Sequence, residues 1–299
     1  MDLDMTAPRL FEPRLLRLRK QRRAKHLAEA AFLHARAGVD LAERLEAIPR
    51  HFEKTLVLGG HGAFRRALAG HASLRERLGW MVEADIAAAA VEIDLERGPF
   101  ADGAFDLVVS PLLLHWANDL PGALSQVRRA LKPDGLALAA LLGGETLTEL
   151  RLALLEAEAE KCGGAAMRIS PFATVQDVGR LMQRAGFALP AADRDVVTVR
   201  YADPLKLLFD LRAMGETAAF AEPAAHALSR GVLSRAMEIY RARHADKDGR
   251  VRATFEIITA TGWAPHESQQ KPLRPGSAKT RLADALGVRE HNPSSDEDP

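Results

Sequence analysis

The first group of residues with a spacing that suggests chemistry is the stretch LVLGGHGAF at residues 56–64. Glycine lets a backbone turn tightly and lets a ligand approach closely, and the first amides of a following helix can donate hydrogen bonds to an anion. The residues predicted to contact a nucleotide-like cofactor are Gly59, Gly60, His61 and Gly62. His61 and Ala63 stand where a G-x-G-x-G loop would have its second and third glycines, so a purely structural turn is the alternative.

Acidic residues end the next two apolar segments. GWMVEAD ends at Asp85 and AAVEID ends at Asp94. A carboxylate at the first position can accept hydrogen bonds from a ribose diol, and one at the second can accept from an adenine amino group. Leu95, next to Asp94, and Ser110, at the end of FDLVVS, complete the predicted cofactor-binding set. The alternative for Asp85 is that its side chain caps a helix.

His115 and Trp116 follow the FDLVVS segment. An imidazole titrates near neutral pH, so His115 is the predicted catalytic residue, a general base for a substrate that must lose a proton. The alternative is a histidine that orders the loop at the start of a helix. Trp116 is predicted to pack rather than to form a platform for the cofactor.

These residues fall at the ends of strands in an alternating pattern. Strands are expected at residues 55–58, 79–85, 89–94, 105–110 and 136–144, with helices at 64–78 and 120–131 and a turn at 132–135. Such alternation with continuously apolar strands predicts a parallel sheet covered on both faces, and ligands bind beyond the carboxyl ends of its strands. The candidate cofactor residues lie at those ends.

The flanking regions are predicted to be mostly helical. Helices are expected at residues 10–25, 26–48, 148–162, 174–186, 203–216 and 223–243, strands at 195–201 and 250–263, and a turn at 246–249. The predicted organisation is a basic helical segment at 1–50 packed on the domain, a main domain at 51–285 and a disordered acidic tail at 286–299. The stretch from Arg14 to Lys25 can contact a membrane surface or an acidic partner, although a packed helix is the favoured interpretation.

Composition excludes several classes of protein. A formal net charge of +1 predicts no global attraction to nucleic acid. The single cysteine, Cys162, excludes an internal disulfide and a cysteine-based metal site, and it is predicted to be inert. The chain has no apolar run long enough for a transmembrane helix, and its start does not resemble a secretory signal, so a cytoplasmic location is expected.

The stretch SPLLLHWANDLPGALSQVRRALKPDG at residues 110–135 resembles the S-adenosylmethionine-dependent methyltransferases of class I. Within that superfamily the chain is similar to the branch of malonyl-carrier-protein O-methyltransferases and of a mitochondrial complex I assembly factor described as an arginine hydroxylase. The similarity continues through LLGGETLTELR, ISPFATVQDVGRLMQRAGF and ATFEIITATGWAPHESQQKPLRPGSA, and so covers nearly all of the chain.

The resemblance implies a seven-stranded, mostly parallel Rossmann-like sheet, S-adenosylmethionine as cofactor and methyl transfer. The family's acid before the first glycine is Val57 here, and the helix between the second and third strands is nearly missing, which predicts a degenerate cofactor loop. The alternatives are a complex I assembly factor with arginine-hydroxylase-like activity, or a non-catalytic binding module. The implied partners are a respiratory complex I subunit as protein substrate, or a small-molecule or carrier-protein acceptor.

Two further stretches contain residue types that occur in functional sites. His244 and Asp246 form an H-x-D pair, with His266 downstream, as in some iron-binding triads. The pair lies at the end of a helix beside a turn rather than on a rigid β-scaffold, so no metal site is predicted. The proline-containing stretch at residues 262–278 is expected to wrap the domain, to contact a protein substrate or to close over the pocket.

Overall fold

The computed structural model describes residues 9–23, 30–222, 224 and 226–270. The chain forms two compact units, Met1–Pro265 and His266–Pro299. The sheet and the candidate site lie in the first unit, whereas only residues 266–270 of the second are described. The predicted tail at 286–299 and the later part of the 262–278 stretch lie outside the described residues.

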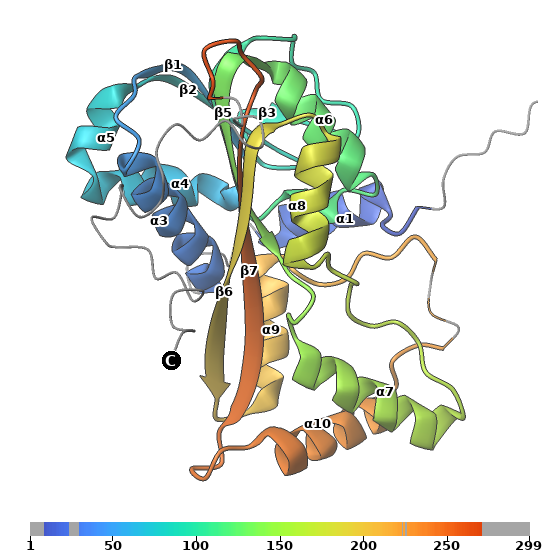
Figure 1. Ribbon diagram of the computed structural model, residues 1–299. Helices are drawn as coiled ribbons and strands as arrows, with labels where there is room; N and C mark the ends of the chain where they lie inside the picture. Colours follow the sequence, from blue (N-terminus) through green and yellow to red (C-terminus); the bar gives the residue numbers. More distant parts are fainter. Residues whose placement is uncertain (1–8, 24–29, 223, 225, 271–299) are drawn as a thin grey trace, which may run out of the picture. The chain divides into compact units, whose positions relative to one another are not determined.

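One seven-stranded sheet organises the first unit, with the strand order β3-β2-β1-β4-β5-β7-β6 (Figure 1). The strands are β1 Phe52–Leu58, β2 Leu78–Asp85, β3 Val91–Glu92, β4 Phe105–Pro111, β5 Leu131–Leu142, β6 Ala188–Tyr201 and β7 Val251–Trp263. β7 is antiparallel to β5 and β6, and the pairs among β1 to β5 are parallel. The predicted α/β fold with a mostly parallel Rossmann-like sheet is therefore confirmed.

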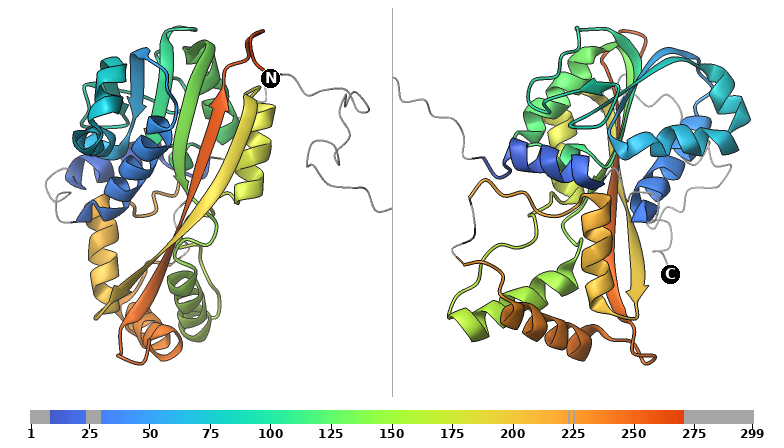
Figure 2. Two further views of the ribbon diagram at one scale, coloured as in Figure 1. Left: turned by 60° about the vertical axis from the view of Figure 1, so that its left-hand side comes forward. Right: turned by 180° about the vertical axis from the view of Figure 1, so that it is seen from behind.

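Both faces of the sheet are covered by helices (Figures 1 and 2). One face carries α3 (Phe32–Glu46), α4 (Ala63–Ala67) and α5 (Ala72–Arg77), and the other carries α1 (Pro13–Arg23), α6 (Leu120–Ala130) and α8 (Val175–Arg184). Side chains of successive strand residues point to opposite faces. Val57 accordingly joins the core under α3, whereas Leu56 and Leu58 join the core under α6 and α8.

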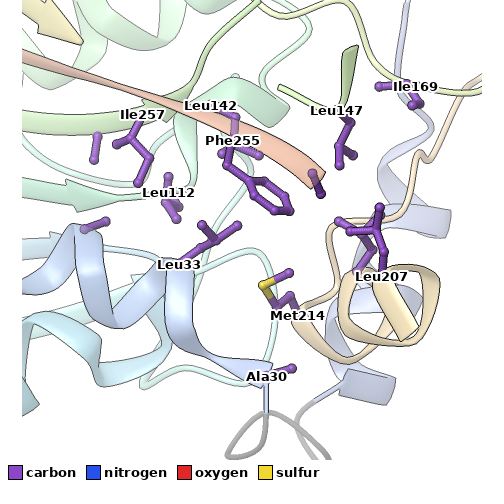
Figure 3. Packing of buried hydrophobic residues seen from close by; sticks show 14 of the residues in the cluster. Ala30, Leu33, Leu112, Leu142, Leu147, Ile169, Leu207, Met214, Phe255 and Ile257 are labelled. Carbon is purple, nitrogen blue, oxygen red and sulfur yellow. The ribbon is translucent and has the colours of Figure 1, made fainter. Parts of the chain in front are cut away.

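The long strands β6 and β7 run beyond the rest of the sheet and carry the helices of the C-terminal half (Figure 1). These helices are α7 (Thr148–Cys162), α9 (Pro204–Met214) and α10 (Arg230–His244). Figure 3 shows Phe255 of β7 together with Leu33 of α3 and Met214 of α9, all three in one core cluster. This shared core holds the start of α3 and the end of α9 against the same strand.

Several predicted boundaries are wrong for local reasons. The single helix expected at 64–78 is broken into α4, the 3-10 turn η2 (Leu68–Gly70) and α5, with the break at Gly70 and His71. The helix expected from residue 223 begins only at Arg230, because the Ser229 side chain caps it by accepting from the Val232 amide. The turn expected at 132–135 lies inside β5, where Asp134 has a φ of 62° and the pairing with β4 shifts its register.

The close contact between α3 and the start of α4 gives a stability prediction. A Cβ at Gly38 would lie 2.8 Å from the backbone carbonyl of Ala63. Gly38→Ala is therefore expected to lower the free energy of unfolding by about 1–3 kcal/mol, although alanine favours helices, because the two backbones must separate. Urea unfolding measures this change. The control is Gly231→Ala in α10, where the nearest atom lies at 3.9 Å, and an equal loss in both variants would contradict the packing argument.

Candidate functional site

The predicted cofactor loop follows β1 in an unusual conformation. Gly59, Gly60, His61 and Gly62 are four consecutive residues with positive φ, at 78°, 73°, 46° and 73°. This region of conformational space is open to glycine, while for His61 it costs about 1–2 kcal/mol. The Gly59 amide donates to the Ala84 carbonyl at 2.7 Å, which ties the loop to the end of β2. The three glycines of this loop are therefore explained by the positive φ angles that its backbone adopts.

The segment after β4 packs directly on this loop. A Cβ at Gly59 would lie 2.6 Å from the Leu113 Cβ, and a Cβ at Gly60 would meet the ring of Pro111. Both glycines are therefore needed for packing, whether or not a ligand binds. The side on which their Cβ atoms would project is filled by Leu113 at Gly59 and by Pro111 at Gly60.

Asp85 is the last residue of β2, and it is 2% exposed. Its Oδ1 accepts from the Ile86 amide at 2.7 Å, and its Oδ2 lies 3.0 Å from His61 Nε2. Residues 86–90 form bends rather than a helix. The alternative in which Asp85 caps a helix is therefore wrong, and the carboxylate faces the glycine loop.

Four of the predicted cofactor residues surround one hollow of about 290 Å³. Its lining residues are Gly59, His61, Gly62, Glu83, Ala84, Asp85, Ala88 and Ala89. Small-molecule pockets usually begin near 300 Å³, so this hollow is large enough for part of a nucleoside.

Asp94 and Leu95 lie elsewhere, in a separate hollow of about 90 Å³ that is also lined by Phe11, Leu16 and Trp116. The prediction that Asp94 ends a strand is wrong, because β3 stops at Glu92 and Asp94 pairs with Arg97 in an isolated bridge.

Ser110 connects two strands rather than lining either of these two hollows. It lies within β4 and is 1% exposed, and its hydroxyl donates to the Leu58 carbonyl at 3.3 Å. This bond holds the ends of β1 and β4 together. The structure thus gives Ser110 a supporting contact behind the loop.

His115 lies in the 3-10 turn η3 (Leu114–Trp116) directly after β4. Its Nε2 is 3.0 Å from Oε2 of Glu216, and the Trp116 indole donates to the same oxygen at 3.0 Å. Trp116 also packs edge-on against Phe11, with ring centroids 5.0 Å apart. The expected packing role of Trp116 is observed, together with a polar contact that the sequence did not predict.

Glu216 and His34 are the members of the site that sequence reasoning missed. α9 ends at Met214, and the φ of 73° at its C-cap Gly215 allows the Glu216 amide to donate back to the Leu211 carbonyl at 2.8 Å. His34 comes from the buried face of α3, and its Nε2 lies 3.7 Å from Glu216 Oε1. Its ring also lies edge-on to His61 at 5.7 Å. In the sequence, the only sign of this arrangement is that a glycine and then an acid, Gly215 and Glu216, follow a predicted helix.

These contacts form a continuous buried cluster from the glycine loop to Trp116. Its members, which we call the histidine–carboxylate cluster, are Asp85, His61, His34, Glu216 and His115. Among the residues that the structure describes, no group of three or more such side chains is arranged to hold a metal ion. The contacts that join the members of the cluster are ion pairs, a hydrogen bond and a ring contact.

The electrostatics of the cluster favour an ionised Glu216. Burial on its own raises the pKa of this carboxyl group, but His115, Lys20 and His34 together lower it well below its ordinary value of 4.5. Lys20 comes from α1 and is 1% exposed. A buried anion beside these groups is the expected arrangement, because an uncompensated buried charge is costly.

Helix α1 is packed on the domain, which is the interpretation favoured from the sequence. Leu16 and Lys20 are one helical turn apart and both are buried. The Arg19 guanidinium donates to the Thr217 carbonyl, and Arg17 pairs with Glu92 at 3.0 Å. The predicted Lys25 end of this stretch lies outside the described residues. None of the described helices is long and apolar enough to span a membrane.

The residues present fit one part of S-adenosylmethionine. The Asp85 carboxylate at the end of β2, facing a hollow beside a left-handed glycine loop, suits a ribose diol. On the side where a Cβ would project, Gly59 is covered by Leu113 and Gly60 by Pro111. The fit to S-adenosylmethionine therefore depends on Asp85 and on the side of the glycine loop that faces the hollow.

Several known proteins are similar in sequence to this chain over most of its length. Residues 60–139 match the family described as "Methyltransferase domain". The arginine-hydroxylase NDUFAF5, mitochondrial, of Danio rerio is 40% identical over 85% of this chain and 81% of its own length. The Homo sapiens protein of that name is 39% identical over 91% and 83%. Malonyl-[acyl-carrier protein] O-methyltransferase of Halorhodospira halophila is 33% identical over 89% and 92%.

Solved structures agree on the fold. A candidate methyltransferase from Bacillus halodurans superposes with a TM-score of 0.50 at 17% identity, over 76% of this chain and 99% of its own. At that identity the likeness concerns the fold alone. The relatives, which are 33–40% identical over 81–92% of their own length, show that the chain belongs to the S-adenosylmethionine-dependent methyltransferase superfamily, in the branch of NDUFAF5 and the malonyl-[acyl-carrier protein] O-methyltransferases.

Proposed function

We propose that the protein binds S-adenosylmethionine at the hollow beside Asp85 and transfers its methyl group to an acceptor. The observation that supports this most is the pairing of a left-handed glycine loop with a buried carboxylate at the end of β2. When bound, the cofactor supplies an electrophilic methyl group. The protein's part is to hold the acceptor close to it and to exclude water, which accounts for much of the rate of such reactions.

An arginine side chain of a protein is the acceptor that we favour. The relatives named arginine-hydroxylase match at 39–40% identity, against 33% for the malonyl-carrier-protein enzyme. Hydroxylation of that arginine is the second candidate function, supported by the relatives' name. A respiratory complex I subunit is the proposed protein partner, in keeping with the resemblance to an assembly factor of that complex.

Replacing Asp85 tests the cofactor site. Asp85→Ala is expected to weaken binding of S-adenosylhomocysteine by roughly tenfold or more, because hydrogen bonds to a charged group contribute about 1.5–3 kcal/mol. The matched control is Glu83→Ala, since Glu83 lines the same hollow but pairs with Arg65 at 2.7 Å. Isothermal titration calorimetry measures both, and equal affinities in the two variants would show that Asp85 does not hold the ribose.

The mass of the modified substrate separates the two candidate reactions. Complex I subunits are incubated with the protein, S-adenosylmethionine, dioxygen and a reductant, because hydroxylation takes an oxygen atom from dioxygen and needs two further electrons. Their arginine-containing peptides are then weighed by mass spectrometry. Methyl transfer adds the mass of one methylene group, whereas hydroxylation adds the mass of one oxygen atom. Unmodified peptides, with no subunit retained on the immobilised protein, would contradict both the reaction and the partner.

A further inference from the structure

His61 covers the carboxylate on which the proposed cofactor site depends. Its Nε2 lies 3.0 Å from Asp85 Oδ2, and both of these atoms are buried. The two side chains are only 9% and 3% exposed, although both residues line the hollow of about 290 Å³. A ligand that enters this hollow therefore meets the imidazole of His61 before it reaches Asp85 Oδ2.

The other oxygen of the Asp85 carboxylate also has a partner. Oδ1 accepts from the Ile86 amide at 2.7 Å, so the carboxylate is held by the backbone on one side and by His61 on the other. A ribose donates its hydroxyl groups to a carboxylate at this position of the fold. The Ile86 amide is adjacent in the chain and stays in place, so His61 is the contact that such a ligand must replace.

The backbone of His61 is fixed, which confines its movement to the side chain. The residue has φ 46° and ψ 49°, and its carbonyl accepts from Arg66 Nη1 at 2.9 Å. The Gly59 amide, two residues earlier, donates to the Ala84 carbonyl. The loop is thus held on both sides of His61, and rotation about the Cα–Cβ bond is the movement that takes the imidazole away from Asp85.

We propose that His61 competes with the cofactor ribose for Asp85 and thereby sets the affinity of the site. The inference rests on the proposed function and adds to it a residue that controls cofactor binding. His61 pairs with Asp85 in the ligand-free protein and leaves it when two ribose hydroxyls bind there. Because two donors replace one imidazole, Asp85 still contributes to binding. A competent form present in about one molecule of ten lowers the apparent affinity roughly tenfold.

The His61→Asn variant tests the competition. Asparagine tolerates the left-handed backbone of residue 61, but its shorter amide does not reach Asp85 Oδ2. By isothermal titration calorimetry on the full-length protein, this variant is expected to bind S-adenosylhomocysteine about tenfold more tightly than the wild type, about 1.4 kcal/mol. His61→Gly, which removes the side chain altogether, should change the affinity in the same direction. Equal or weaker binding by both variants overturns the inference.

Two controls separate the His61–Asp85 pair from other effects of the substitution. Leu189 also has a positive φ, 49°, and it lies on β6 outside the hollow. Leu189→Asn should leave the affinity within about twofold of the wild type, because distant sites act independently. In an Asp85→Ala background, where no carboxylate is covered, His61→Asn should also change the affinity by less than about twofold. A tenfold gain in either control contradicts the competition.

Nitrogen-15 NMR of the His61 ring follows the contact itself. The His61 signals, identified by their absence in His61→Asn, should move on saturation with S-adenosylhomocysteine toward those of ligand-free Asp85→Ala, in which the ring has no carboxylate beside it. Signals that keep their ligand-free positions in the saturated wild-type protein overturn the inference. Absence of binding in both the wild type and His61→Asn refutes the proposed function and the inference together, whereas wild-type binding without a gain in His61→Asn refutes the inference alone.

Discussion

Gly59→Ala is expected to lower the free energy of unfolding by about 3 kcal/mol. Gly59 has φ 78° and ψ −155°, a region that is almost restricted to glycine, and the new Cβ would lie 2.6 Å from the Leu113 Cβ. Backbone strain at residue 59 and the steric overlap with Leu113 therefore both destabilise the Gly59→Ala variant. Urea unfolding followed by circular dichroism measures the loss, and cofactor binding should be lost as the loop shifts.

The control for this prediction is Gly70→Ala. Gly70 ends the 3-10 turn η2, has no positive φ, and an added Cβ there meets no atom within 4 Å. Its free energy of unfolding should stay within about 0.5 kcal/mol of the wild type. A Gly59→Ala protein as stable as Gly70→Ala would mean that the loop does not adopt the conformation described.

Glu216→Leu is expected to destabilise the protein by about 3–5 kcal/mol. The substitution removes the carboxylate that compensates the histidine–carboxylate cluster and leaves Lys20 buried without this anion, which is the costly way to break a buried pair. Chemical unfolding at neutral pH measures the loss. Glu160→Leu is the control, because Glu160 pairs with Arg235 at the surface, and its replacement should change stability little.

The same carboxylate predicts a pH dependence. Burial opposes ionisation, but His115, Lys20 and His34 lower the pKa of Glu216 below its ordinary value of 4.5. The unfolded chain thus binds this proton more readily, so the contribution of Glu216 is complete above pH 4.5 and declines as the pH falls further. Stability curves of the wild type and Glu216→Leu should converge in acid. Parallel curves down to the acid limit would contradict this account.

The sequence predicted those parts of the site that are local to one strand end. The glycines after β1 and the acid at the end of β2 follow directly from the alternation of strands and loops, and the structure places Gly59, Gly62 and Asp85 around one hollow. Asp94 was misplaced for a local reason too. The chain after Asp85 is too short to form a helix and a full strand, so β3 ends before Asp94 is reached.

The remainder of the site depends on contacts that no local pattern encodes. Glu216 and His34 are far apart in the sequence and meet because Met214 and Leu33 belong to one core cluster (Figure 3). Lys20 is one of many cations in a basic helix, and nothing in the sequence distinguishes this buried lysine from its neighbours. Periodicity indicates which face of a helix is apolar, but a buried charge on that face is visible only when its partners are in place.

Titration of the wild-type protein with S-adenosylhomocysteine and S-adenosylmethionine tests the central claim most directly, namely that the hollow at Asp85 is a cofactor site. Calorimetry is expected to show one site per chain with a dissociation constant in the micromolar range, about 8 kcal/mol of binding free energy. Binding weaker than about 1 mM, roughly 4 kcal/mol, would contradict the claim and leave the protein with the methyltransferase fold but without its cofactor.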